Sequence, residues 1–207
     1  MTGKQLLPLS GVASVLLIVA SFIVVGESPD LDAPAREVVS YYSDNDSSLQ
    51  WGAALLALGA FFFMLFATTI ASLLRRDPAR GAVAAHFSFA GGIVFAVGAT
   101  IFAGLAFTAG DAVDDVGPAT LQTLHALEMD MFFTIAVGTA AFLLGAGIGA
   151  LKSGVLPSWL AWVAIVIGVI AITPLGFFGF LALGIWTLIV SVMLAMQARV
   201  APAPGVD

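Results

Sequence analysis

The chain has 207 residues, of which 60% are hydrophobic and only 10% are charged. This composition lies far outside the range of soluble proteins and indicates an integral membrane protein, with the lipid bilayer as its main partner. The chain contains no cysteine, which excludes disulfides, thiolate metal sites and cysteine nucleophiles. The net charge of −6 argues against nucleic-acid binding, because that function needs a basic surface.

The apolar segments of the chain are long enough to cross a bilayer as helices. The predicted fold class is therefore all-α, a polytopic bundle of six transmembrane helices that forms one domain over residues 1–207. The last two helices are predicted to form a hairpin, because the break at Pro174 and Gly176 divides an apolar segment about twice as long as the hydrocarbon is thick. The six helices are expected at about residues 6–25, 50–74, 82–109, 118–151, 156–173 and 177–196.

A polar segment, residues 26–49, separates the first two predicted helices and is expected to form the main external loop. Within it, Asp32 and Pro34 make a helix start signal, so residues 35–44 are expected to form a short amphipathic helix. Val38, Tyr41 and Tyr42 fall at positions i, i+3 and i+4 and share one face. Such a face suits a helix that lies at the membrane interface or caps the bundle. The alternative is a loosely ordered acidic loop.

The basic residues predict the orientation of the bundle. With six helices, Arg36 alone falls on one side, together with most of the acids. By the positive-inside rule the other side is cytoplasmic, and so are both termini. We therefore expect a multi-pass protein of a bacterial cytoplasmic (inner) membrane, with Trp51, Trp159 and Trp162 as anchors at the interface. The cytoplasmic basic residues are Lys4, Arg75, Arg76, Arg80, Lys152 and Arg199.

The fourth predicted helix carries the best candidates for a functional site. His125 and Glu128 are three residues apart and share a helix face, whereas Asp130 points elsewhere. Counted along the helix from Lys152, these residues reach the outer edge of the hydrocarbon, where we expect a shallow vestibule. Arg36 is expected to face these acids, so the four residues form the predicted site for a ligand, a proton or a cation. The alternative is a group of interfacial polar residues that water and their own contacts satisfy.

No cofactor, metal ion or catalytic residue is assigned from the sequence. His86 and His125 are expected near opposite sides of the membrane, about 25 Å or more apart, so one haem cannot bridge them. The His125-x-x-Glu128 spacing reverses the Glu-x-x-His spacing of di-iron bundles, and a second such element is missing. No glycine-rich phosphate loop or nucleophile elbow is present.

Small residues mark a helix face suited to close packing. Gly138, Gly145 and Gly149 give the fourth predicted helix a small-residue surface for contact with another helix. Packing within the chain is favoured over a seam between subunits, and docking of a partner membrane subunit stays open.

Several short motifs run from Leu124 to Gly168. They are Leu124-His125, Leu143-Leu144-Gly145, the turn Leu151-Lys152-Ser153-Gly154-Val155-Leu156-Pro157, and Trp159-Leu160-Ala161-Trp162. With these motifs the chain resembles a family of uncharacterised bacterial six-helix membrane proteins, described as a domain of unknown function. The Glu128-Met129-Asp130 segment departs from the pattern, since members tend to carry small or apolar residues there. The resemblance implies the six-helix fold and brings no known activity.

These observations favour a protein that binds a ligand or handles a small solute or ion, with an outward-facing vestibule near Glu128 and Asp130. One alternative is a structural or accessory subunit of a membrane complex, with a partner helix docked on the glycine surface. The other is a membrane enzyme that acts on a lipid or quinone, with His125 as acid or base and Glu128 as its orienting partner. The enzyme ranks last, because one histidine and two acids at an interface are a thin basis for catalysis.

Overall fold

The computed structural model describes residues 7–76 and 78–200 of the chain. Within these ranges the fold is all-helical, with a short 3-10 helix η1 (Leu7–Leu9) followed by seven α-helices. The predictions that involve Lys4, Leu6, and the side chains of Arg80 and Arg199 lie outside the described residues. The α-helices are α2 (Ser10–Val25), α3 (Ala35–Asp44), α4 (Asp46–Leu74), α5 (Pro78–Asp111), α6 (Pro118–Ser153), α7 (Ser158–Ala171) and α8 (Gly176–Val200).

Five stretches of helix are long and apolar enough to cross a membrane. The predicted span at residues 156–173 corresponds to α7, which has only 14 residues. At 1.5 Å per residue α7 is about 21 Å long, shorter than the roughly 30 Å of hydrocarbon that a span must cross. The described residues therefore contain five candidate membrane spans and one further apolar helix, the composition of a membrane protein. The five spans are Leu7–Val25, Asp46–Leu74, Gly81–Asp111, Pro118–Ser153 and Gly176–Ala198.

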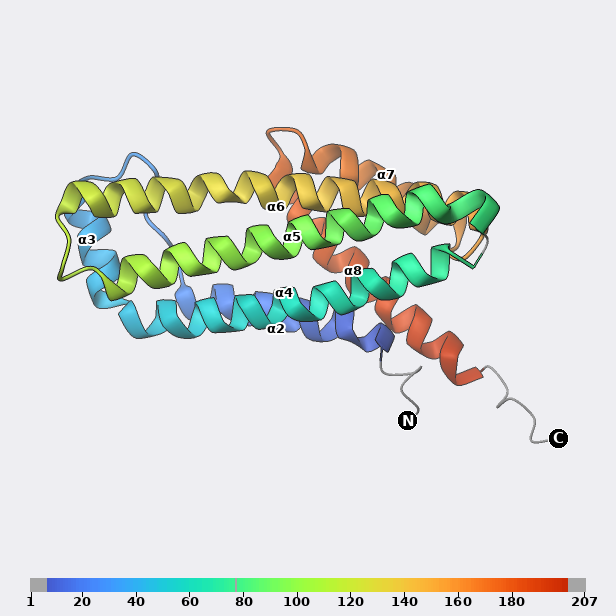
Figure 1. Ribbon diagram of the computed structural model, residues 1–207. Coiled ribbons are helices and arrows are strands. Elements are labelled where there is room, and N and C mark those ends of the chain that lie inside the picture. Colours follow the sequence, from blue (N-terminus) through green and yellow to red (C-terminus); the bar gives the residue numbers. More distant parts are fainter. Residues whose placement is uncertain (1–6, 77, 201–207) are drawn as a thin grey trace.

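The chain runs up and down the bundle, so successive long helices are antiparallel neighbours. Figure 1 shows α4, α5 and α6 side by side along the length of the molecule, with α2 against α4 and α7 against α6. The predicted break before Gly176 is a turn, in which the Gly176 N–H donates to the Thr173 carbonyl at 2.9 Å. The chain reverses there, and the Trp186 indole N–H of α8 donates to the Leu160 carbonyl of α7 at 3.0 Å.

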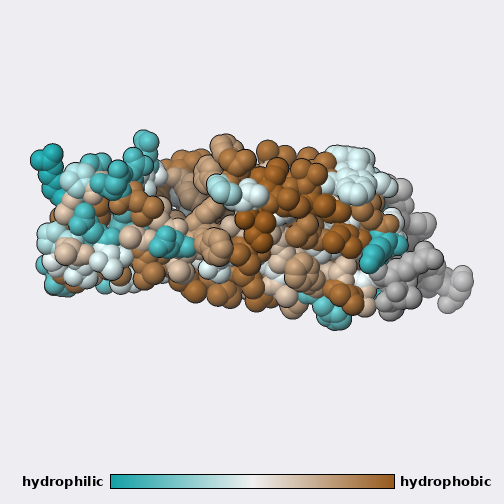
Figure 2. Space-filling model, turned by 90° about the horizontal axis from the view of Figure 1, so that it is seen from above, coloured by the Kyte–Doolittle hydropathy of each residue, from teal (hydrophilic) through white to brown (hydrophobic). Residues whose placement is uncertain are grey.

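The long helices α4, α5 and α6 extend past the turn between α7 and α8, toward the end of the molecule where α3 lies (Figure 1). α5 has 34 residues and α6 has 36. At 1.5 Å per residue they are about 51 and 54 Å long, well over the thickness of the hydrocarbon. Figure 2 shows hydrophilic side chains gathered at the α3 end and hydrophobic side chains over much of the remaining surface. The α3 end therefore has the surface of a part that lies outside the bilayer.

Two serines and two glycines join α2 to α4 at the spacing of two helical turns. The Ser14 hydroxyl donates to the Gly59 carbonyl at 2.8 Å, and the Ser21 hydroxyl donates to the Gly52 carbonyl at 2.7 Å. A Cβ atom on Gly59 would lie 2.7 Å from the Ile18 side chain, so only glycine allows this approach. Such small-residue contacts with interhelical hydrogen bonds are typical of packing in membranes, where the hydrophobic effect does not drive helices together.

The small-residue surface of α6 is occupied by neighbouring helices of the same chain. Gly138 and Gly145 are buried, and a Cβ atom on either would collide with the α5 backbone, at Phe95 and Ser88 respectively. A Cβ atom on Gly149 would lie 2.9 Å from the Leu74 side chain at the end of α4. The structure thus places these three glycines against α5 and α4.

Candidate functional site

Helix α3 lies at the polar end of the bundle and packs one face against α6 (Figure 1). Val38 and Tyr42, two members of the predicted apolar face, are buried, while Tyr41 is only half-buried. They pack on Leu49 of α4 and Leu121 of α6. The face predicted for α3 therefore docks on the bundle and carries Tyr42 into its interior.

Tyr42 brings the two predicted polar residues of α6 into one buried cluster. The Tyr42 hydroxyl donates to Glu128 Oε2 at 2.8 Å and lies 3.0 Å from His125 Nδ1. The second ring nitrogen, Nε2 of His125, lies 3.1 Å from the carbonyl oxygen of Pro29 in the loop before α3. The exposed fractions are 0% for Tyr42, 1% for His125 and 6% for Glu128. We call these three residues the Tyr42 cluster.

The partners of the Tyr42 cluster limit where its hydrogens can lie. The Pro29 carbonyl can only accept, so His125 Nε2 carries a hydrogen. The Tyr42 hydroxyl has one hydrogen to place between Glu128 and His125. If that hydrogen points to a Glu128 carboxylate, His125 Nδ1 must donate to the hydroxyl and the ring is cationic. If it points to Nδ1, the ring is neutral and Glu128 must be protonated. Both complete networks share one proton and have no net charge.

The Tyr42 hydroxyl stays protonated in the folded protein. Burial, and then the neighbouring Glu128 carboxyl, raise its pKa well above the ordinary value of 10.0. The same two causes raise the pKa of Tyr41. Because a phenolate is disfavoured at this position, Tyr42 keeps the hydrogen on which the cluster depends.

Glu128 also lines an apolar cavity between the helices, which we call the chamber. Its volume is about 390 Å³. Apart from Glu128 and the phenol of Tyr41, the described residues on its walls are not ionisable. Walls come from α2, α3, α4, α5, α6 and α8 and from the loop before α3. They include Val25, Ala53, Phe95, Ala99, Ala103, Phe132 and Phe180.

An apolar groove of about 670 Å³ runs between α2 and α8, next to the chamber. Four phenylalanines line both spaces. Its outer rim carries large exposed apolar side chains, among them Val19, Ile23 and Ile185. The shared phenylalanines are Phe22, Phe95, Phe177 and Phe180.

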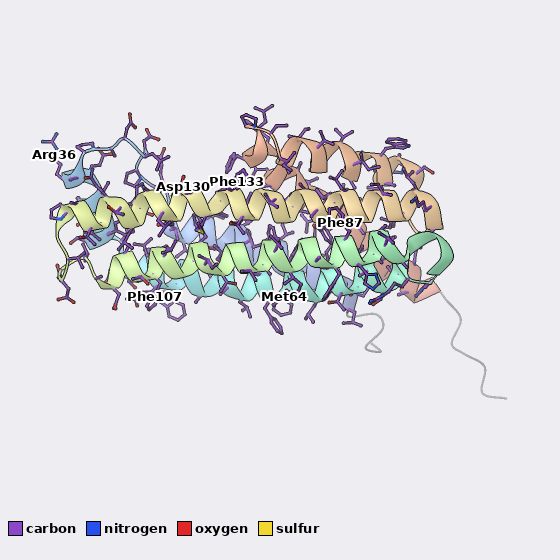
Figure 3. All side chains as sticks on the ribbon, turned by 45° about the horizontal axis from the view of Figure 1, so that its top comes forward. Arg36, Met64, Phe87, Phe107, Asp130 and Phe133 are labelled. Carbon is purple, nitrogen blue, oxygen red and sulfur yellow. The ribbon has the colours of Figure 1, made fainter. Side chains whose placement is uncertain are left out.

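The structure brings together only two of the four residues of the predicted site. His125 and Glu128 meet through Tyr42, and both are too buried to be satisfied by interfacial water. Asp130 is exposed and is not part of the chamber wall. Arg36 is exposed and lines a surface hollow with loop acids such as Glu27 and Asp30. Figure 3 shows Arg36 at the polar end of the molecule and Asp130 farther along α6.

Sequence reasoning missed Tyr42 and Pro29 as parts of the site. The sequence pattern places Tyr42 on an apolar face and gives its hydroxyl no role. A signal for it existed, since a buried tyrosine usually needs a hydrogen-bond partner and His125 and Glu128 share one helix face. Pro29 contributes a backbone carbonyl, which a sequence pattern does not reveal.

The geometry also bears on the enzyme alternative. Both ring nitrogens of His125 already have partners, and the ring is not part of the chamber wall. Within the described ranges, no group of three or more histidines, cysteines and acids could hold a metal ion.

The predicted interface anchors Trp51, Trp159 and Trp162 all lie exposed on the surface.

The family model described as Domain of unknown function (DUF4386) matches residues 9–201. This range includes the segment from Leu124 to Gly168 and most of the rest of the chain. A search of curated proteins found no match, and a search of solved structures found none.

Proposed function

The chain belongs to this family of unknown function, and from the geometry of its site we propose that it is a membrane protein that binds a small amphiphilic molecule in the chamber. One observation carries the proposal: a single carboxyl group, that of Glu128, lines a cavity whose walls are mostly apolar. An ionisable group that is buried beside apolar side chains is costly, and it is therefore a candidate for a functional role. The apolar walls suit the body of a ligand, and Glu128 suits its polar head.

The size and chemistry of the chamber support this assignment. Ligand sites are clefts of roughly 300–1,000 Å³, mostly apolar, with a few polar groups that fix orientation. The chamber, with about 390 Å³, lies within that range. The Tyr42 hydroxyl and the helix backbone hold Glu128 in place, so the carboxyl is positioned before a ligand arrives.

The groove between α2 and α8 is the proposed route into the chamber. Its rim of exposed apolar residues would meet lipid, and a ligand would pass the four shared phenylalanines, whose side chains border both spaces. A ligand that dissolves in the bilayer would reach Glu128 by this path without crossing water. The exposed position of Asp130 supports a role for Glu128 alone as the polar anchor.

We propose the topology that the charges predict. The polar end with α3 lies outside, α7 with its flanking residues completes a sixth span, and both termini face the cytoplasm of a bacterial inner membrane. The exposed acids and Arg36 near α3, and Arg75, Arg76 and Lys152 at the other ends of the helices, support this orientation by the positive-inside rule.

Photolabelling in lipid nanodiscs tests the proposed function. A ten-carbon alcohol that carries a diazirine is crosslinked to the protein, and the labelled peptides are identified by mass spectrometry. We expect the label on chamber residues such as Phe132. The Ala103→Phe variant fills the chamber and should abolish this label, whereas Ala90→Phe, on the exposed side of the same helix, should not. Equal labelling of all lipid-facing helices, unchanged in Ala103→Phe, would rule the function out.

A further inference from the structure

We propose that the ligand of the chamber is a lipophilic cation, and that it binds in exchange for the proton held by the Tyr42 cluster. The inference rests on the proposed function and adds the chemical class of the ligand and its coupling to protons. The inference is based on the position of Glu128, which belongs to both sites. Its Oε2 atom accepts a hydrogen bond from Tyr42, and the residue also lines the chamber.

Charge complementarity selects a cation. Glu128 is the only acid among the described residues that line the chamber. The walls contributed by α2, α4, α5 and α8 carry no ionisable side chain. Tyr41, the other ionisable group on the wall, is neutral because burial raises its pKa. A carboxylate in apolar surroundings gains most from a ligand of opposite charge, since an unpaired buried charge is strongly disfavoured.

The hydrogen count of the Tyr42 cluster couples cation binding to proton release. Without ligand, the network in which Tyr42, Glu128 and His125 all have hydrogen-bond partners contains one shared proton and is neutral, wherever that proton lies. A monovalent cation beside Glu128 would leave an uncompensated positive charge if the cluster kept this proton. Loss of the proton leaves a Glu128 carboxylate that accepts from Tyr42 and a neutral His125 ring whose Nε2–H still faces the Pro29 carbonyl. The cation and the carboxylate then balance each other.

The proton that leaves the Tyr42 cluster is the one shared by Glu128 and His125 Nδ1, and it passes to water or buffer. His125 Nε2 keeps its hydrogen on the Pro29 carbonyl, and Pro29 also lines the polar surface hollow beside α3. Beside the three residues of the Tyr42 cluster, the titratable group that faces it is Tyr41 of α3. The hollow adds Glu27, Asp30, Glu37 and Asp44 on its outer side, with Arg36 beside them.

Calorimetry on the full chain in nanodiscs tests this exchange. The probes are octyltrimethylammonium, whose charge does not change with pH, and 1-decanol, a neutral amphiphile. The part of the binding heat that the wild type shows and the Ala103→Phe variant lacks is attributed to binding in the chamber. Comparison of two buffers with different ionisation enthalpies should show release of about one proton per bound cation and none per bound alcohol. The affinity for the cation should rise about tenfold per pH unit while the cluster keeps its proton.

The wild-type chain alone decides the question, and two variants identify the acid. Glu128→Gln should lose most of the binding of octyltrimethylammonium and retain that of 1-decanol, whereas Asp130→Asn should behave like the wild type. If cation and alcohol bind with equal affinity and no proton is released, the inference is overturned while the proposed function stands. Proton release that persists in Glu128→Gln also overturns it. If neither probe gives chamber binding and the photolabel is absent too, the proposed function fails as well.

Discussion

The Tyr42 hydroxyl and the Glu128 carboxyl lie 2.8 Å apart, although 86 residues separate them in the chain. The bond joins α3, the helix at the polar end, to α6, which crosses the bundle. Because the same carboxyl lines the chamber, the docking of α3 and the charge state of the chamber depend on one another. This link underlies the first two predictions below.

Removal of the Tyr42 hydroxyl should destabilise the fold. Tyr42→Phe leaves Glu128 Oε2 and His125 Nδ1 buried without their partner, and a buried polar group that loses its hydrogen bond costs about 1–3 kcal/mol. Thermal unfolding in detergent should show a lower Tm than for the wild type. Tyr41→Phe is the matched control, since that ring is only half-buried. A decrease no larger than that of Tyr41→Phe would contradict the importance of the cluster for stability.

Stability should fall at alkaline pH. The folded structure raises the pKa of both Tyr41 and Tyr42 above the unfolded value of about 10. Their contribution is therefore complete below pH 10 and is lost as the pH rises above it, because the unfolded chain ionises more readily. These are the only tyrosines of the chain, so phenolate absorbance reports on α3 alone. We expect phenolate to appear together with loss of the fold. Reversible ionisation near pH 10 in a protein that keeps its Tm would disprove this.

Close contact between α5 and α6 should depend on glycine at position 145. A Cβ atom on Gly145 would collide with the Ser88 backbone, so Gly145→Ala is expected to cost about 1–3 kcal/mol through overpacking. Gly104→Ala, on α5, is the control, because a Cβ atom there meets nothing within 4 Å. Both changes raise helix propensity equally, so a difference in Tm isolates the packing effect. Equal Tm values for the two variants would show that α5 and α6 do not approach this closely.

The absence of cysteine makes the orientation simple to measure. Glu37 on α3 and Lys152 at the end of α6 are both exposed and become single labelling sites as Glu37→Cys and Lys152→Cys. In intact cells, a membrane-impermeant maleimide should react with the first variant, and with the second only after permeabilisation. The reverse pattern would invert the proposed topology.

The sixth span has its own test, because α7 is short. If α7 with its flanking residues crosses the membrane, the end of α8 returns to the side of Lys152. The exposed Gln197 near that end, replaced as Gln197→Cys, should then react only after permeabilisation. Reaction in intact cells, with Lys152→Cys protected, would leave five spans and place α7 on one side of the membrane.

Much of the fold follows from local sequence. The helix predicted for residues 35–44 is α3 (Ala35–Asp44), and the other helices agree closely with the predicted ranges. The break at Pro174 is a turn. These features depend on runs of apolar residues and on proline and glycine, whose effects act over a few residues. The shared face of His125 and Glu128 is equally local, since residues three apart on a helix are neighbours.

What lies beside each helix face was decided only by the tertiary structure. The rotation of α6 about its axis buries Glu128 and leaves Asp130 exposed, and the path of the loop before α3 sends Arg36 outward. The docking of α3 selects Tyr42 as the partner of His125 and Glu128, and the spacing of α2 and α8 opens the groove. These contacts join residues far apart in the chain, and side-chain packing rather than local propensity sets them.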